Sequence, residues 1–406
     1  MTVRPPERPA SGHPTLIILA LAMGAFAIGT TEFAAMSLVP YFARDLGLSE
    51  PQAGHAISAY ALGVVVGAPT IAVLGARLAR RTLLIGLMGM FAFANGLSAT
   101  ASSYPSLLLF RFLSGLPHGA YFGVAALVAA SLVPANARAQ SVAKVMTGLT
   151  IATIIGVPAA NWLGQIIGWR SGFGIVAGLA LVTMVLVTLF APRDHGGPRS
   201  SPLRELDALR RPQVLLTLLT GAIGFGGLFC VYTYVASTMI EVTKVREALV
   251  PLVLAVFGVG MTVGNLFWAW LADRRLNHAA IGAFVWSAVA LGLFPLVAGN
   301  IWLLTFDILL IGFGGGLGTI LQTRLMDVAG EAQALAAAAH HSAFNVANAL
   351  GPWLGGLAIG AGYSLRMTGW IGVGLSLGGL AVFLLTLALH RRQERRVPDG
   401  CCPAPV

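Results

Sequence analysis

Charged residues are scarce in this chain of 406 residues. They make up 10% of the sequence, whereas a soluble globular domain carries roughly 25%. Hydrophobic residues reach 57%, and the mean hydropathy is +0.82. The net charge of +10 is scattered between apolar runs and forms no basic domain, which argues against nucleic acid as a partner. The composition predicts an integral membrane protein that crosses the lipid bilayer with helices.

Cysteine and lysine are also rare. Cys230 lies in an apolar run and Cys401 and Cys402 near the C-terminus, with no metal-ligand spacing, so we expect neither a disulfide framework nor a metal or other cofactor. Neither Lys144 nor Lys244 follows a glycine, so the Gly-Lys-Ser/Thr loop of an ATP-driven pump is missing. No extended nucleophile–base constellation appears either, which makes an intramembrane enzyme a remote alternative.

Long apolar runs, by contrast, recur along the whole chain. Twelve of them reach the ~20 residues that a tilted helix needs to cross a bilayer. They cover residues 14–40, 52–75, 82–101, 105–132, 139–165, 170–191, 213–239, 247–272, 279–298, 301–325, 332–360 and 366–390. The sequence predicts an all-α membrane fold with an N-terminal six-helix bundle (1–191), a linker (192–212), a C-terminal six-helix bundle (213–390) and a tail (391–406).

The basic residues divide unevenly between the connections. With the N-terminus inside, nineteen of the 25 lysines and arginines fall on the inner side of the membrane. Five fall on the outer side, namely Arg44, Arg170, Lys244, Arg246 and Arg366. Because basic connections are retained in the cytoplasm, we expect both termini, the linker and the tail to be cytoplasmic.

The two halves resemble copies of each other. Similar segments recur at an offset of 196 (108–119 with 304–315) and 197 (74–81 with 271–278), and 156–164 resembles 351–356 at nearly the same offset. Two parallel six-helix repeats form a known transporter plan, in which the substrate site lies near the midplane between the repeats.

Several motifs carry a family resemblance. The fourth-span pattern RFLSGLPHG (111–119), the basic connection after the second span and the fifth-span GVPAANWLG (156–164) resemble motifs of the major facilitator superfamily. GTTEFAAMSLVPYFARDLGLS (29–49) and AISAYALGVVVGAPTIA (56–72) are similar to the arabinose and sugar efflux branch of its drug:proton antiporters. The resemblance implies the major facilitator fold, a multi-pass monomer in a bacterial inner (plasma) membrane, and proton-coupled export.

The resemblance also assigns conformational roles to particular motif residues. They are Arg77, Arg80, Arg81, Gly115, Pro117, Gly119, Gly156, Pro158, Asp273 and Arg274. The acid expected ahead of Arg77 is replaced by Ala76, whereas the second copy keeps Asp273. We therefore expect a weakened charge relay in the first half and a larger share of that role in the second.

Four ionisable residues lie well inside the spans, and we expect them to couple transport to protons: Glu32, Arg111, His118 and Asp307. A charge at the bilayer centre costs at least ~2.5–3.5 kcal/mol, so such residues are functional candidates. Glu32 and Arg111 lie at similar depth and are expected to pair or to alternate partners, with a purely structural ion pair as the alternative. At an offset of 196, Asp307 corresponds to Arg111.

The fourth span gathers its candidates on one helical face. Arg111, Ser114, Gly115, His118 and Phe122 follow the i, i+3, i+4, i+7, i+11 pattern. Small residues every fourth position, including Gly119 and Gly123, predict close helix packing, and Pro117 predicts a bend. This face is expected to line a cavity, with His118 as proton relay or substrate ligand.

Further polar and aromatic residues are candidates for the substrate pocket, with helix-packing hydrogen bonds as the alternative for each. They are Tyr60, His118, Asn161, Tyr232, Tyr234, Gln322, His341, Asn345 and Asn348. Hydroxyl, amide and aromatic groups suit a sugar, and the apolar side chains equally suit an amphiphilic drug.

The sequence thus predicts a secondary active transporter. It would export a small solute from the cytoplasm by proton antiport through alternating access, with the solute, protons and the lipid bilayer as its partners. A uniporter or proton-coupled importer of the same fold remains an alternative, as does a chloramphenicol, multidrug or nucleoside exporter.

Overall fold

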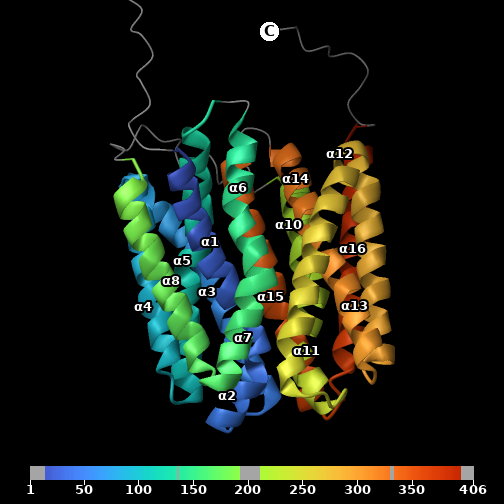
Figure 1. Ribbon diagram of the computed structural model, residues 1–406. Helices are drawn as coiled ribbons and strands as arrows, with labels where there is room; N and C mark the ends of the chain where they lie inside the picture. Colours follow the sequence, from blue (N-terminus) through green and yellow to red (C-terminus); the bar gives the residue numbers. More distant parts are fainter. Residues whose placement is uncertain (1–13, 135–136, 193–210, 330–332, 395–406) are drawn as a thin grey trace, which may run out of the picture.

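The computed structural model describes residues 14–134, 137–192, 211–329 and 333–394, and every regular element in these ranges is helical (Figure 1). The predicted linker (192–212) and tail (391–406) lie largely outside the described residues. The domain boundaries at these two segments therefore stay predictions.

Among the described residues, the first half contains eight α-helices. They are α1 (Pro14–Ser37), α2 (Val39–Leu46), α3 (Glu50–Leu74), α4 (Arg80–Ala99), α5 (Tyr104–Ser131), α6 (Arg138–Ile151), α7 (Val157–Ile166) and α8 (Arg170–Phe190). A single π-helical turn, Ala152–Gly156, joins α6 to α7, so the two form one interrupted span. Leu38 separates α1 from the short helix α2, which ends the first span earlier than expected.

The second half contains seven helices. They are α10 (Pro212–Gly224), α11 (Gly226–Glu241), α12 (Val250–Val297), α13 (Ile301–Phe313), α14 (Leu317–Ala329), α15 (Gln333–Gly360) and α16 (Met367–Glu394). Breaks at Phe225 and at the glycine triplet Gly314–Gly316 divide two spans into α10 with α11 and α13 with α14.

Twelve membrane crossings follow from these helices. Ten helical stretches are long and apolar enough to span a membrane, and one of them, Glu247–Val297, is long enough for two. Its helix α12 bends at Arg275, whose backbone is not helical, so it supplies the two predicted spans 247–272 and 279–298. The more polar helix α15, which carries His340, His341, Asn345 and Asn348, completes the set of twelve.

The repeat is visible in how glycines let helices touch. In each half, a Cβ placed on three glycines would overlap a backbone carbonyl oxygen of the facing helix. The pairs are Gly63–Phe112, Gly67–Leu116 and Gly115–Tyr60 between α3 and α5, and Gly260–Leu309, Gly264–Phe313 and Gly312–Phe257 between α12 and α13. Adding 197 to each residue of the first set gives the second set.

This register changes one sequence-based expectation. At an offset of 197, Arg111 corresponds to Ile308, and Asp307 corresponds to Phe110. The expected equivalence of Asp307 with Arg111 is therefore out by one residue, which is about 100° around a helix. Sequence similarity alone did not distinguish the two offsets.

The two halves stand side by side, and α15 lies at their boundary (Figure 1). It packs more extensively against α3 of the first half than against α11 of its own half. The helices α1 and α16 respectively begin and end on one face of the bundle, which we call the termini face, and α2 lies on the opposite face (Figure 1).

Candidate functional site

Glu32 lies on α1 at the boundary between the halves. Its side chain is 5% exposed, and its Oε1 accepts a hydrogen bond of 3.1 Å from Nδ2 of Asn348 on α15. Close by in sequence to Asn348, the carbonyl of Ala349 accepts a hydrogen bond of 2.9 Å from Ser58 on α3. A buried carboxyl thus takes part directly in holding the two halves together.

Arg111 is buried on α5 without the expected ion pair. One of its NH groups donates to the hydroxyls of Thr31 at 3.3 Å and Ser114 at 3.2 Å. Its guanidinium lies 4.4 Å from the ring centre of Tyr60 and 5.0 Å from that of Phe173. Among the described residues no ion pair joins it to Glu32, and its Nε has no partner. Hydroxyls and ring faces therefore hold the cation, and a direct Glu32–Arg111 pair is absent from this conformation.

Thr31 and Asn95 support Arg111 and escaped the sequence reasoning. The Thr31 hydroxyl donates to Oδ1 of Asn95 at 2.8 Å while accepting from Arg111. The Asn95 amide in turn donates to the carbonyl of Phe91 at 2.9 Å. A lone asparagine in the third span, and a threonine next to Glu32, were the signals that could have found them.

His118 lies on the same face of α5 as Arg111, two helical turns further along, as the helical pattern predicts. Its Nδ1 and the hydroxyl of Tyr60 form a hydrogen bond of 2.8 Å. Arg111, Ser114, Gly115, His118 and Phe122 are all buried, so this face of α5 points into the protein. Tyr60 connects the two ionisable residues, since its ring faces Arg111 and its hydroxyl binds His118.

A second contact between the halves involves aromatic rings on the termini side of Glu32. The rings of Phe122 on α5 and His341 on α15 stack at a centroid distance of 5.3 Å and an interplanar angle of 4°. Phe122 also lies 5.3 Å from the ring of His118. The predicted residues His118 and His341 are thereby brought together around one phenylalanine.

The centre of the boundary is lined by aromatic rings and unpaired polar atoms. Tyr232 packs 4.1 Å from Phe257 and edge-on to Phe33 of the other half at 5.7 Å, measured between ring centres. Its buried hydroxyl has no partner among the described residues, and neither do the side-chain oxygens of Asn345 and Asn348. Such atoms are rare in native proteins and are usually satisfied by water or a ligand.

Four predicted residues lie apart from this group. Asn161 donates to the carbonyl of Ser37 at 2.9 Å and accepts from Gln165, which is a helix-packing role. Tyr234 is buried and donates to the carbonyl of Pro352 at 2.9 Å within the second half. Gln322 is half-buried on α14, and Asp307 is 2% exposed on α13 with both carboxyl oxygens unpartnered among the described residues.

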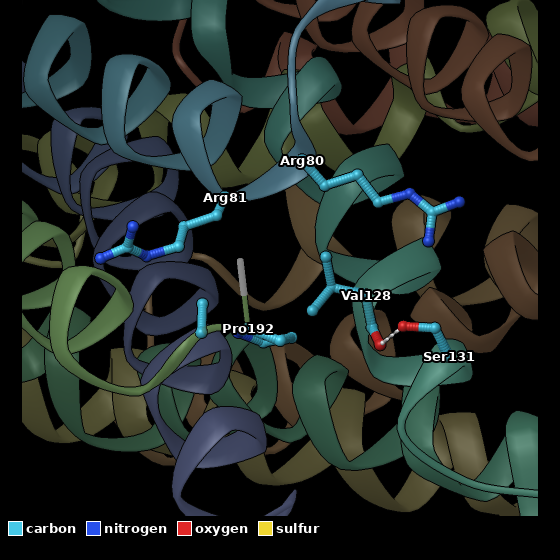
Figure 2. Close-up of a pocket in the computed structure, with 6 residues that line it drawn as sticks. Arg80, Arg81, Val128, Ser131 and Pro192 are labelled. Atoms are coloured by element: carbon cyan, nitrogen blue, oxygen red, sulfur yellow. Dashed lines mark hydrogen bonds between the residues drawn. The ribbon is translucent and has the colours of Figure 1, made fainter. Parts of the chain in front are cut away.

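The residues to which the family resemblance assigns conformational roles lie at the termini face and along the glycine contacts between helices. Arg80 and Arg81 begin α4 and extend to either side of a small cavity (Figure 2). Arg77, Asp273 and Arg274 are exposed, and Arg274 covers the ring of Trp270 at 3.9 Å.

The glycine motifs differ in how tightly they pack. A Cβ on Gly119 would lie 2.7 Å from Cβ of Ala68, whereas one on Gly123 would have nothing within 4 Å. The predicted ridge therefore includes Gly115 and Gly119 and ends before Gly123. Gly156 closes the π-helical turn against Thr30 and Phe26, and Pro158 begins α7 next to it.

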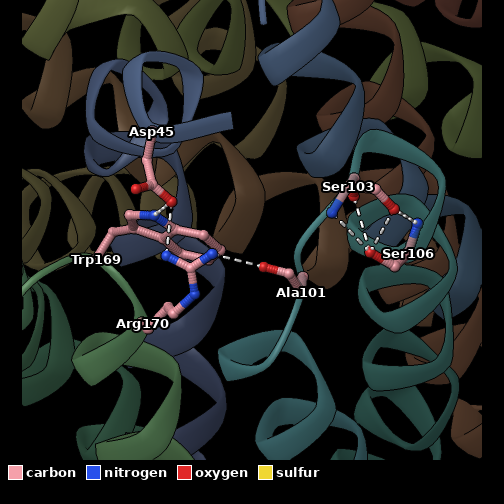
Figure 3. A network of polar contacts seen from close by, with 6 residues as sticks. All are labelled: Asp45, Ala101, Ser103, Ser106, Trp169 and Arg170. Carbon is pink, nitrogen blue, oxygen red and sulfur yellow. Dashed lines mark hydrogen bonds and ion pairs between the residues drawn. The ribbon is translucent and has the colours of Figure 1, made fainter. Parts of the chain in front are cut away.

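The face opposite the termini is held by polar contacts. Within the first half, Asp45 accepts from Arg170 at 2.6 Å and from Trp169 at 3.0 Å, and Arg170 also reaches the carbonyl of Ala101 (Figure 3). These hydrogen bonds hold the pKa of Asp45 below its usual range. At the start of α5, Ser103 and Ser106 cap each other's backbone (Figure 3).

The same face also joins the halves to each other. Arg44 pairs with Glu247 at 3.3 Å, Gln165 donates to the carbonyl of Glu247 at 2.9 Å, and Ser237 donates to Glu50 at 2.7 Å. Polar contacts between the halves thus run from this face to Glu32 at the centre. The structure is closed on the side opposite the termini.

Comparison with known proteins identifies the family. The family model of the Major Facilitator Superfamily matches residues 21–243 and 229–400, which together cover most of the chain. The chain belongs to the major facilitator superfamily. It is therefore a membrane transporter and not an enzyme, as predicted.

Curated relatives agree with this assignment. The chain is 41% identical over 380 residues to "Inner membrane transport protein YdhP" of Escherichia coli, covering 93% of this chain and 97% of that protein. A "Chloramphenicol resistance protein" of Streptomyces lividans is 34% identical, with 84% and 88% covered. A "Probable sugar efflux transporter" of Helicobacter pylori is 29% identical, with 91% and 94% covered. The inner-membrane location agrees with the first of these names.

Solved structures confirm the predicted fold. A bacterial homologue of the lysosomal transporter Spinster matches with a TM-score of 0.67 at 16% identity, covering 92% of this chain and 96% of that one. The nucleoside transporter NupG matches with a TM-score of 0.70 at 14% identity, covering 91% and 99%. At these identities the likeness concerns the fold alone.

Proposed function

We propose that this major facilitator transporter exports a small neutral solute from the cytoplasm in exchange for protons. The observation that carries the proposal is the hydrogen bond between Glu32 and Asn348 across the boundary of the halves. Protonating a carboxylate changes what it can accept and donate. A proton on Glu32 therefore acts directly on a contact that must break when the halves rock.

Arg111 supplies the alternative partner for Glu32. In this conformation its charge is held by two hydroxyls and two aromatic faces, and its Nε has no partner among the described residues. Deprotonated Glu32 gains more from a cation than from a neutral amide, because the attraction between opposite charges adds to the hydrogen bond in the low-dielectric interior. We infer that Glu32 exchanges Asn348 for Arg111 as the transporter opens, with His118 relaying protons through Tyr60.

The polar groups at the centre of the boundary between the halves favour a neutral solute that carries hydroxyl groups. Within the part of the chain that the structure describes, the Tyr232 hydroxyl and the side-chain oxygens of Asn345 and Asn348 have no partners, and aromatic rings lie beside them. Hydroxyls satisfy such atoms, and the apolar face of a sugar packs on aromatic rings. Chloramphenicol-like drugs are the second candidate, because Phe33, Phe229 and Phe257 form an extended apolar surface at the same boundary.

Solute-evoked proton movement in inside-out vesicles tests the proposal. The panel contains arabinose and other sugars, chloramphenicol, nucleosides and lipophilic cations. We expect one solute class to dissipate the pH gradient with the wild type and not with Glu32→Gln. Glu241→Gln is the matched control, since Glu241 is an exposed acid at the end of α11.

Two comparisons make the result specific. Asn348→Ala is expected to lower coupled transport more than Asn345→Ala, because Asn345 donates within its own helix to the carbonyl of His341. Asp307→Asn measures whether the second-half carboxyl contributes. Solute uptake that persists in Glu32→Gln without proton movement supports the role of Glu32, whereas unchanged proton-coupled transport in that variant would remove it from the mechanism and favour a different coupling residue.

A further inference from the structure

A polar cavity lies at the termini face of the second half, away from Glu32. Its volume is about 500 Å³, and it is bounded by the start of α10, the bend of α12 and the ends of α14 and α16. Arg211, Gln213, Arg324, Asp327 and His390 contribute its polar groups. Two arginines against one aspartate give the cavity a positive character.

Two buried atoms in this cavity have no hydrogen-bond partner among the described residues. One is Nε of Arg324, a side chain that is only 6% exposed, and the other is Oε1 of Gln213. The rest of Arg324 is held in place, since its NH1 donates to Asn277 at 2.9 Å and its guanidinium lies 5.2 Å from the Phe383 ring centre. Arg324 is a fixed cationic donor and Gln213 an acceptor, and both side chains line the cavity, although the two unpartnered atoms themselves are buried.

The first half has a cavity in the equivalent place. Its volume is about 180 Å³, and it is lined by the start of α4 and the ends of α5 and α8 (Figure 2). Ser131 in the first cavity and Val328 in the second are 197 residues apart, which is the repeat offset. Arg81 lines this cavity, and its buried Nε likewise has no partner in the described parts of the chain. A basic cavity with an unsatisfied arginine therefore recurs in both halves, although the arginines come from different helices.

The unpartnered atoms indicate the chemistry of an occupant. A guanidinium with a free N–H binds the oxygens of phosphate or carboxylate, and a cavity where helices end lies at the level of lipid headgroups. The buried Gln213 acceptor needs a hydrogen-bond donor on the same ligand. Basic pockets between helices on the cytoplasmic side commonly bind anionic headgroups.

We propose that the cavity formed by Arg211, Gln213, Arg324 and His390 binds a phosphate ester whose substituent carries a hydrogen-bond donor. The glycerol headgroup of phosphatidylglycerol and a soluble glycerol phosphate share this chemistry. Binding joins the ends of α10, α14 and α16, and so stabilises the second half. The equivalent cavity at Arg81 is smaller and binds the same group less completely.

Thermal unfolding of the purified full chain tests this site. The protein is washed in dodecyl maltoside until its phosphorus content is constant, and is then titrated with dioleoyl phosphatidylglycerol, dioleoyl phosphatidylcholine or sn-glycerol 3-phosphate. We expect phosphatidylglycerol to raise the Tm saturably. In Arg324→Gln, half-maximal stabilisation should need at least about tenfold more lipid, because a charge-assisted hydrogen bond is lost. Arg391→Gln, an exposed arginine beside His390, is the matched control.

The possible outcomes separate the source of the ligand from its existence. A rise with glycerol phosphate that is lost in Arg324→Gln supports the site with a soluble ligand. Equal stabilisation by phosphatidylcholine contradicts the need for a donor, and equal titrations of the wild type and Arg324→Gln overturn the proposal, as does the absence of any rise. If Arg324→Gln does not fold, Arg211→Gln and Gln213→Leu carry the same comparison.

Discussion

The α3–α5 contact in the first half and the α12–α13 contact in the second share a backbone arrangement and differ in chemistry. Three glycine–carbonyl approaches recur at an offset of 197. At that offset Tyr60, Arg111, Ser114 and His118 correspond to Phe257, Ile308, Ile311 and Gly315. Every polar group of the first contact is replaced by an apolar residue or a glycine in the second.

This difference separates what packing requires from what transport uses. Both halves need the glycines, because only a residue without a Cβ lets the backbones approach so closely. At this contact only the first half carries a buried cation and a histidine, which our proposal assigns to transport. The second half contributes its polar groups to the boundary through α15, where Asn348 reaches Glu32.

The largest effect is expected on folded yield, at the glycine–carbonyl contacts that the two halves share. Gly115→Ala and Gly312→Ala each place a methyl group against a backbone carbonyl, of Tyr60 and Phe257 respectively. Overpacking against a rigid backbone costs about 1–3 kcal/mol or more, so both variants should lose most of their folded yield. Fluorescence-detected gel filtration and thermal unfolding measure this. Gly123→Ala, with nothing within 4 Å, should behave as the wild type, and equal losses in all three would contradict the packing argument.

A smaller effect is expected on coupled transport, at the position where the first half carries Arg111 and the second half an isoleucine. Arg111→Ile introduces the residue that the second half carries at this position, and should lower coupled transport about 10- to 100-fold through the loss of a charge-assisted partner. The fold should survive, because an apolar residue replaces a buried charge without a counter-ion. Transport assays in vesicles are compared with Ile308→Val, which should stay near the wild type. Full transport by Arg111→Ile would mean that Arg111 serves packing alone.

The smallest effect concerns the face opposite the termini. The pKa of Asp45 is lowered by its hydrogen bonds to Arg170 and Trp169, so the ionised form stabilises the folded state. This contribution is present above the ordinary aspartate pKa of about 4 and is lost as the pH falls through the lower folded value. Asp45→Asn should therefore narrow the gap in Tm between pH 6 and pH 3. Because Asp45 and Arg170 lie in one half and their side chains are only partly buried, transport at neutral pH should change little.

The spans were predictable because apolar runs of the required length are a direct consequence of the bilayer. The breaks inside them were not. The π-helical turn at Ala152–Gly156 and the break at Phe225 lie within continuous apolar sequence, and only tertiary packing selects them. The order of apolar residues does not report a change in backbone hydrogen bonding.

The site was predictable in its residues and less so in its pairings. Depth along a helix follows from residue number, and it placed Glu32 and Arg111 at a similar level, which agrees with the hydrogen bond from Arg111 to Thr31 beside Glu32. Partner choice depends on rotation and on the other half, so Asn348 for Glu32 and Thr31 for Arg111 could not be derived. Asn161 illustrates the opposite case, in which a polar residue predicted for the pocket holds helices together.

The position of α15 has a consequence for how the protein is made. This helix is the penultimate one to leave the ribosome, it is more polar than its neighbours, and it packs most extensively against α3. Polar helices enter a membrane poorly by themselves and are retained when earlier helices offer them partners. The first six spans are therefore in the membrane before α15 and provide the surface on which it packs. The central boundary is assembled only when synthesis is nearly complete. Chains truncated before residue 333 should therefore lack the boundary altogether and be substrates for quality-control proteolysis.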